Sequence, residues 1–164
     1  MPVHIEMSVS DAAASDEDVP DAESIQHWVE QSCFCEQPVV VSVRVVSSDE
    51  MRELNRTWRG IDKPTNVLSF PMESPAEVNL NLLGDLAVCA SVIEQEARQQ
   101  HKPVEAHWAH MLVHGVLHLQ GFDHIEEAQA AEMEALEIRI LGQLGFNNPY
   151  LGVDDQQFVE SKQS

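Results

Sequence analysis

The feature that most constrains this chain is a run from His114 to His124, which reads H-G-V-L-H-L-Q-G-F-D-H. An α-helix turns by about 100° per residue, so His114 and His118, four positions apart, point the same way from one helix. Gly121 then allows a turn that can bring His124 back toward the other two. Three converging imidazoles with a fourth position open to water are typical of catalytic zinc. The run therefore predicts one Zn²⁺ ion held by His114, His118 and His124, with the site carried on a helix.

The same spacing admits other interpretations. It coincides with the metzincin pattern H-E-x-x-H-x-x-G-x-x-H, except that Gly115 stands where the peptidases carry their glutamate base. The histidines could also simply pack in the core or lie on the surface. A structural zinc is a further alternative, although such sites usually have four protein ligands, often cysteines, and no cysteine lies near the run. Without a glutamate at position 115, phosphodiester hydrolysis stays open, because a metal-bound hydroxide can attack and a nearby arginine can neutralise phosphate charge.

Four more side chains are candidates for supporting this site. His107 and His110 precede His114 at helical spacing and could either orient a ligand or simply pack. Metal-bound imidazoles usually donate their second N–H to a carboxylate or a carbonyl. Asp85 and Asp123 are the carboxylates considered for that role, although Asp123 could equally serve as a turn or cap residue.

The length and composition of the chain indicate an ordinary globular protein. A chain of 164 residues is expected to form one domain, residues 1–153, followed by a flexible tail over 154–164. No apolar stretch is long enough for a membrane span, and the first residues do not resemble a signal peptide. Three cysteines without a C-x-x-C pair indicate a reducing compartment. We therefore expect a cytoplasmic protein.

The net charge of −19 disfavours bulk attraction to nucleic acid or to an anionic membrane. One stretch departs from this acidity, since four of the nine basic residues fall within twelve positions: Arg52, Arg56, Arg59 and Lys63. Because Glu53 and Asp62 are interleaved with them, the stretch is either a helix face of mixed charge or a patch that meets an anionic substrate. The sequence favours neither interpretation.

Hydrophobic periodicity predicts four strands and four to five helices. The strands are expected at 3–9, 39–46, 65–70 and 82–89, the last interrupted by Gly84-Asp85, and the helices at 20–32, 49–58, 92–101, 103–119 and 125–144. Ser48 and Ser91 are the expected N-caps of the second and third helices. The second helix should bury Met51, Leu54 and Trp58. This order of elements predicts an α+β domain in which a mixed four-stranded sheet packs against the helices.

Three motifs together resemble one known family. The histidine run matches H-G-x-L-H-L-x-G-[YF]-D-H, with Phe122 in place of the commoner tyrosine. Residues 58–70 read W-R-G-I-D-K-P-T-N-V-L-S-F and match R-G-x-x-x-P-T-[DN]-V-L-S-F, with Asn66 where many members carry aspartate. Leu83-Gly84-Asp85 matches the third motif, L-G-D. The chain thus resembles the YbeY-type endoribonucleases, the bacterial rRNA maturation factors, over roughly residues 40 to 145.

The resemblance implies a single-strand-specific, metal-dependent endoribonuclease that acts in 16S rRNA 3′-end maturation and 70S ribosome quality control. It implies that His114, His118 and His124 bind zinc, with His114 also part of the catalytic set, and that Arg59 contacts a phosphate. The implied partners are single-stranded rRNA, the small ribosomal subunit and its basic ribosomal or assembly proteins. The alternatives are a zinc metalloprotease with the same histidine spacing and a ribosome-assembly factor whose zinc is structural.

The acidity bears on how such an enzyme would meet RNA. Phosphate contacts supply most non-specific RNA affinity, so a chain of charge −19 should bind free RNA weakly. We therefore expect a basic ribosomal partner to deliver the RNA. The alternative is that the acidity serves only solubility.

Overall fold

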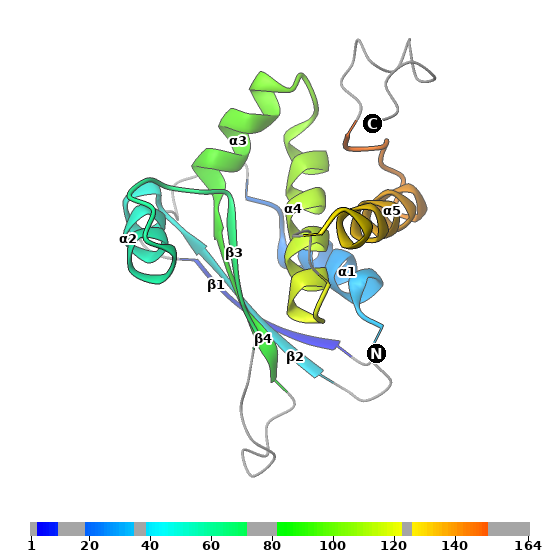
Figure 1. Cartoon of the computed structure of the whole chain (residues 1–164), viewed down its shortest axis with the longest axis horizontal. Coiled ribbons are helices and arrows are strands. Elements are labelled where there is room, and N and C mark those ends of the chain that lie inside the picture. Colours follow the sequence, from blue (N-terminus) through cyan, green and yellow to red (C-terminus); the bar gives the residue numbers. More distant parts are fainter. Residues whose placement is uncertain (1–2, 10–18, 35–38, 72–81, 123–125, 151–164) are drawn as a thin grey trace.

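The computed structural model describes residues 3–9, 19–34, 39–71, 82–122 and 126–150. Nine elements follow one another along these residues (Figure 1): β1 (Val3–Val9), α1 (Ala22–Ser32), β2 (Val39–Val46), α2 (Ser48–Arg59), β3 (Val67–Pro71), β4 (Leu82–Cys89), α3 (Ala90–Gln99), α4 (Val104–Leu119) and α5 (Glu127–Gln143). The prediction of four strands and four to five helices is confirmed. The expected tail at 154–164 lies outside the described residues and stays a prediction.

The strands form one mixed sheet in the order β1-β2-β4-β3. β1, β2 and β4 are parallel, whereas β3 pairs antiparallel with β4 and forms an edge of the sheet. β2 shows why this segment becomes a strand: its valines are β-branched, and Val41, Val43 and Val45 are fully buried on one face. The predicted α+β domain with a mixed four-stranded sheet is therefore confirmed.

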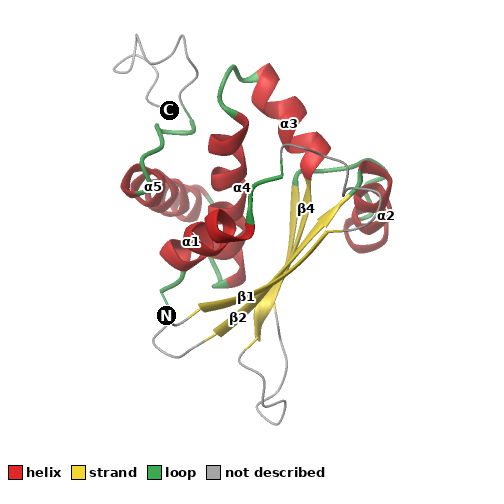
Figure 2. Ribbon diagram, turned by 180° about the vertical axis from the view of Figure 1, so that it is seen from behind, coloured by secondary structure: helices red, strands yellow, loops and turns green. Residues whose placement is uncertain are grey.

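Helices cover the two faces of the sheet unequally. Figures 1 and 2 show α1, α4 and α5 on one face and α2 on the other. The larger core lies on the first face, where α4 is central and buries Trp108, Leu112 and Val116 completely. A smaller cluster under α2 contains Met51 and Leu68. Any side chain of the sheet therefore faces either the α4 side or the α2 side.

Alternation along β4 assigns its residues to these two sides. A Cβ on Gly84 would lie 2.5 Å from Leu119 Cδ2, which places Gly84 against α4. Leu86 also faces α4, because its Cδ2 atom would lie 2.8 Å from a Cβ on Gly115. Since neighbouring residues in a strand point to opposite faces, Asp85 lies on the α2 side.

Three local predictions are wrong. Ser47, not Ser48, caps α2: its hydroxyl accepts from the Glu50 N–H, and the Glu50 carboxylate accepts from the Ser47 N–H. α3 begins at Ala90, directly after β4, so Ser91 lies inside the helix and does not cap it. β4 is not interrupted at Gly84-Asp85 but runs through it, and a bulge in the pairing with β2 absorbs the irregularity.

The prediction that Trp58 is buried is also wrong. Met51 is fully buried and Leu54 partly buried, but 66% of Trp58 is exposed. Its indole contacts Phe70 edge-to-face, with ring centroids 5.9 Å apart. Because Phe70 belongs to the edge strand β3, no further strand of the described sheet lies beyond it to cover the indole.

No helix among the described residues is long and apolar enough to cross a membrane. α4 is the most apolar of them, but it has 16 residues and carries four histidines.

Candidate metal centre

The two histidines of the predicted i, i+4 pair lie together on α4. The ring centroids of His114 and His118 are 4.7 Å apart, and both residues are half-buried on a helix whose neighbouring positions are buried. Gly121 has a φ of 100° just after the helix, as the turn requires. His124 lies outside the described residues, and within those residues no group of three or more metal-ligating side chains forms a site. The three-histidine zinc site therefore stays a prediction.

A carboxylate that the sequence analysis missed lies beside His114. Glu137 of α5 is fully buried, and its two oxygens lie 2.8 Å from His110 Nε2 and 2.7 Å from His114 Nδ1. The Tyr150 hydroxyl donates to the same carboxylate. Burial opposes ionisation, but the hydrogen bonds from His110 and His114 outweigh it and lower the pKa of Glu137 to about 2. Glu137 is therefore an anion that accepts three hydrogen bonds.

This anion determines which nitrogen of His114 carries the proton. An ionised carboxylate can only accept, so His114 Nδ1 must donate to it, which leaves Nε2 as the nitrogen that can bind a metal. A neutral imidazole oriented by a carboxylate in this way is the usual form of a zinc-ligating histidine. The donor chemistry at His114 therefore fits a zinc ion.

The other two histidines of α4 each contact a carboxylate, His110 that of Glu137 and His107 that of Glu96. His110 donates through Nε2 to Glu137, and burial lowers its pKa despite the nearby carboxylate, so the ring stays neutral. His107 Nε2 lies 2.8 Å from Glu96 Oε1. Glu96 also accepts from the Asn66 amide at 3.0 Å, which links the start of β3 to α3 and α4. His107 and His110 are both buried, and whether they also orient a metal ligand stays a prediction.

Gly115 faces the sheet. A Cβ at this position would lie 2.8 Å from Leu86 Cδ2 and 3.4 Å from both Ser69 Oγ and Val67 Cγ2. The Gly115 carbonyl also accepts a hydrogen bond from the Ser69 hydroxyl. No glutamate side chain fits there without displacing the core.

The remaining predicted site residues lie elsewhere or are not described. Arg59 ends α2 and is exposed, and Asp85 is on the α2 side of the sheet. Within the described residues, neither makes a hydrogen bond or an ion pair with His114 or His118. Asp123 lies outside the described residues.

Two of the four basic residues in the stretch 52–63 form ion pairs within it. Arg52 pairs with Asp62 at 2.8 Å and Arg56 with Glu53 at 2.5 Å. In the described part of the chain, Arg59 takes part in no ion pair. The α2 face is therefore of mixed charge, and contact between Arg59 and an anionic substrate stays a prediction.

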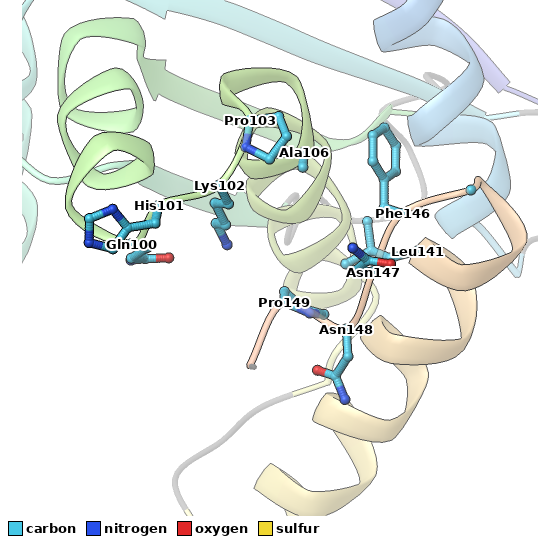
Figure 3. A pocket seen from close by; sticks show the side chains of 11 residues that line it. Gln100, His101, Lys102, Pro103, Ala106, Leu141, Phe146, Asn147, Asn148 and Pro149 are labelled. Carbon is cyan, nitrogen blue, oxygen red and sulfur yellow. The ribbon is translucent and has the colours of Figure 1, made fainter. Parts of the chain in front are cut away.

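A pocket lies between the α3–α4 turn and the segment after α5 (Figure 3). Lys102 lines it from the turn, and burial lowers the pKa of this amine although Glu96 opposes the shift. Asn148 lines it from the other side, and its side-chain oxygen accepts from the Tyr150 N–H at 2.8 Å. The pocket wall thus helps to position the tyrosine that donates to Glu137.

A sequence signal for Glu137 existed. The apolar stripe of the last helix includes Met133 and Ile140, and Glu137 lies four residues after one and three before the other. It therefore shares their face, where a charged residue is not expected unless it has partners.

Comparisons with known proteins identify the family of this chain. A family model described as "Endoribonuclease YbeY" matches residues 8–145. The chain is also similar to TM1509 from Thermotoga maritima, a structure solved in solution, at 26% sequence identity and a TM-score of 0.54. That alignment covers 99% of this chain and 96% of TM1509. The matched residues include β2 to α5 and all four α4 histidines, and the chain belongs to the YbeY endoribonuclease family.

Proposed function

We propose that this protein is a zinc-dependent endoribonuclease specific for single strands, which acts in 16S rRNA 3′-end maturation and 70S ribosome quality control. Its family supports an endoribonuclease role in rRNA processing. The observation that carries the zinc dependence is the Glu137–His114 hydrogen bond of 2.7 Å, with His118 beside His114. We further propose that the protein works in the cytoplasm on the small ribosomal subunit.

Each residue has a distinct part in this proposal. His114, His118 and His124 hold the ion, and Glu137 keeps the His114 ring in the required tautomer and orientation. When bound, zinc supplies a water of lowered pKa and polarises a phosphoryl oxygen. Arg59 contacts the phosphate through its planar guanidinium group.

Gly115 argues against the metalloprotease alternative. A peptidase of this spacing uses a glutamate at that position as its general base. Here the position points at Leu86 and Val67 and has no room for a side chain. The protein should therefore not digest casein.

The decisive experiment measures cleavage of single-stranded and duplex RNA by purified protein, with its metal content determined in parallel. We expect cleavage of the single strand only, its loss with a chelator, and its recovery when zinc is added. His114→Ala should lose both zinc and cleavage. If zinc binds but RNA stays intact under all conditions, the structural-zinc assembly factor becomes the better explanation.

The role of Arg59 is tested separately. Arg59→Ala should lower the cleavage rate while zinc content and folding stay intact, and Arg59→Lys should rescue it only in part. Arg98→Ala is the matched control, because Arg98 is an exposed helix arginine whose ion pair with Glu94 is on α3. Equal rates for the two alanine variants would show that the assignment of Arg59 is wrong.

A further inference from the structure

Trp58 differs from the other two tryptophans of the chain in its exposure. Trp108 is fully buried and Trp28 is 4% exposed, whereas Trp58 is 66% exposed. Among the described residues, Trp58 has the highest exposed fraction of the three exposed large apolar side chains, which leaves its ring accessible to a ligand.

The indole is nevertheless held in place. Its ring meets Phe70 at an interplanar angle of 70°, and Phe70 itself packs partly buried against the cluster under α2. An edge-to-face pair of this kind restrains the ring without covering it. Trp58 is therefore an anchored, accessible aromatic surface.

The charge around Trp58 has the opposite sign to the rest of the chain. Residues 52–63 contain four basic and two acidic residues, a local charge of +2 in a chain of −19. Both carboxylates are engaged in ion pairs, Asp62 with Arg52 and Glu53 with Arg56. Arg59, adjacent to Trp58, and Lys63 take part in no ion pair within the described residues. This surface complements a polyanion.

The aromatic pair joins α2, which carries Trp58, to the edge strand β3, which carries Phe70 and also borders the histidine helix. Phe70 and Pro71 end β3, and a Cβ on Gly84 would lie 2.7 Å from the Phe70 oxygen and 2.5 Å from Leu119 Cδ2. Leu119 directly follows His118 on α4. The end of α4 and the Trp58–Phe70 pair thus meet the same end of β3 from its two sides.

We propose that Trp58, anchored on Phe70 and flanked by Arg59, is a base-stacking residue for single-stranded RNA. This rests on the proposed function, because it assigns the RNA class and a contact outside the histidines. Exposed aromatic rings beside unpaired arginines bind single strands by stacking on bases, and a duplex, whose bases are stacked on each other, does not offer those faces. A basic protein partner would be drawn instead to the acidic remainder of the surface.

Tryptophan fluorescence can measure RNA binding at Trp58, because the other two tryptophans are buried. Binding of single-stranded RNA to the whole protein, followed in chelator and at low salt so that no cleavage occurs, should quench tryptophan fluorescence through Trp58 alone. Trp58→Ala and Trp58→Leu should both weaken binding roughly 5- to 150-fold, since stacking contributes about 1–3 kcal/mol per base. Trp58→Phe should retain most of the affinity but lose the quenching. Thr57→Ala, an exposed neighbour on the same helix, should bind as the unchanged protein does.

Several outcomes would overturn the proposal. These are unchanged affinity in Trp58→Ala, equal affinity of Trp58→Leu and Trp58→Phe, or absence of saturable quenching at low salt. Loss of binding to isolated ribosomal proteins with RNA binding intact would instead identify Trp58 as a protein-docking residue. Circular dichroism and thermal midpoints establish that each variant is folded. Cleavage by the zinc-loaded protein is measured independently, so quenching without cleavage counts only against the proposed function, and cleavage without quenching only against the role of Trp58.

Discussion

Glu137 is a buried anion held by side chains from two other parts of the chain. Its oxygens accept from His110 and His114 of α4 and from Tyr150 after α5. Removing one member of a buried charged network leaves the others unsatisfied in a medium of low polarity. The residue therefore links the stability of the α4–α5 contact to the orientation of a predicted zinc ligand.

Glu137→Gln should lower both the stability of the fold and the affinity of the protein for zinc. We expect the free energy of unfolding of the metal-free protein to fall by about 1.5–3 kcal/mol, because the histidine N–H groups lose their anionic acceptor. Zinc affinity should fall roughly 10- to 100-fold. Urea denaturation and competition with a zinc-binding dye measure the two effects. Glu132→Gln, an exposed position on the same helix, is the control and should change neither.

Glu96 should contribute to the acid sensitivity of the fold. Burial opposes its ionisation, but the hydrogen bonds from His107 and Asn66 outweigh burial and lower the pKa of Glu96 below its ordinary 4.5. A carboxyl group whose pKa is lower in the folded state stabilises the fold above the unfolded pKa, and this contribution is lost as pH falls through the folded pKa.

Glu96→Gln should therefore cost about 1–2 kcal/mol at pH 7 and flatten the decline of stability below about pH 4.5. Denaturation measured as a function of pH gives both quantities. Glu53→Gln breaks only an exposed ion pair with Arg56 and should leave the curve unchanged. A decline in Glu96→Gln as steep as in the unchanged protein would contradict the assignment.

At the scale of elements, α4 approaches the sheet closely because Gly115 lacks a side chain. Its position faces Leu86 and Val67, whereas Gly142 of α5 has nothing within 4 Å of an added Cβ. Replacing glycine by alanine should therefore lower the stability of the protein at position 115 and raise it at position 142.

Gly115→Ala should destabilise the protein by about 1–3 kcal/mol, because a methyl group overpacks the contact with Leu86. Gly142→Ala should stabilise it by roughly 0.5–1 kcal/mol, since alanine has the higher helix propensity. Thermal or urea denaturation of both variants tests the pair. A stabilised Gly115→Ala would mean that Leu86 moves aside freely.

At the scale of the whole molecule, the charge is distributed against unaided RNA binding. The chain carries −19 overall, and residues 52–63 form a stretch of net charge +2. Exposed charges act over about 8 Å at physiological salt, so this stretch can act on nearby phosphates while the remaining surface repels flanking RNA.

We therefore predict that assembled small subunits bind this protein more tightly than isolated single-stranded rRNA does at the same physiological salt. A basic ribosomal protein would supply the missing attraction. Filter binding or sedimentation at matched salt measures the difference. Equal or tighter binding to naked RNA would show that the acidity serves only solubility.

Features that depend on residues close together in the sequence could be predicted from it. The spacing of His114 and His118 places them on one helix face, the valines of β2 predict a strand, and Gly121 predicts the turn after α4. These features depend on bond geometry repeated every few residues, which any segment carries within itself. The α+β class and the number of strands follow from the same periodicity. The S-x-x-E spacing from Ser47 to Glu50 is the sequence signature of a capping box and favours Ser47 over Ser48 as the cap of α2; the prediction of Ser48 overlooked it.

Only the tertiary structure decided which distant residues meet. Glu137 reaches His114 across 23 positions because α5 packs on α4. Asp85 lies on the α2 side because the register of β4 presents Gly84 and Leu86 to α4. Trp58 is exposed because β3 is an edge strand, although its spacing from Met51 predicted burial. Periodicity says which side of an element is apolar, but where the covering layer ends depends on how the elements pack.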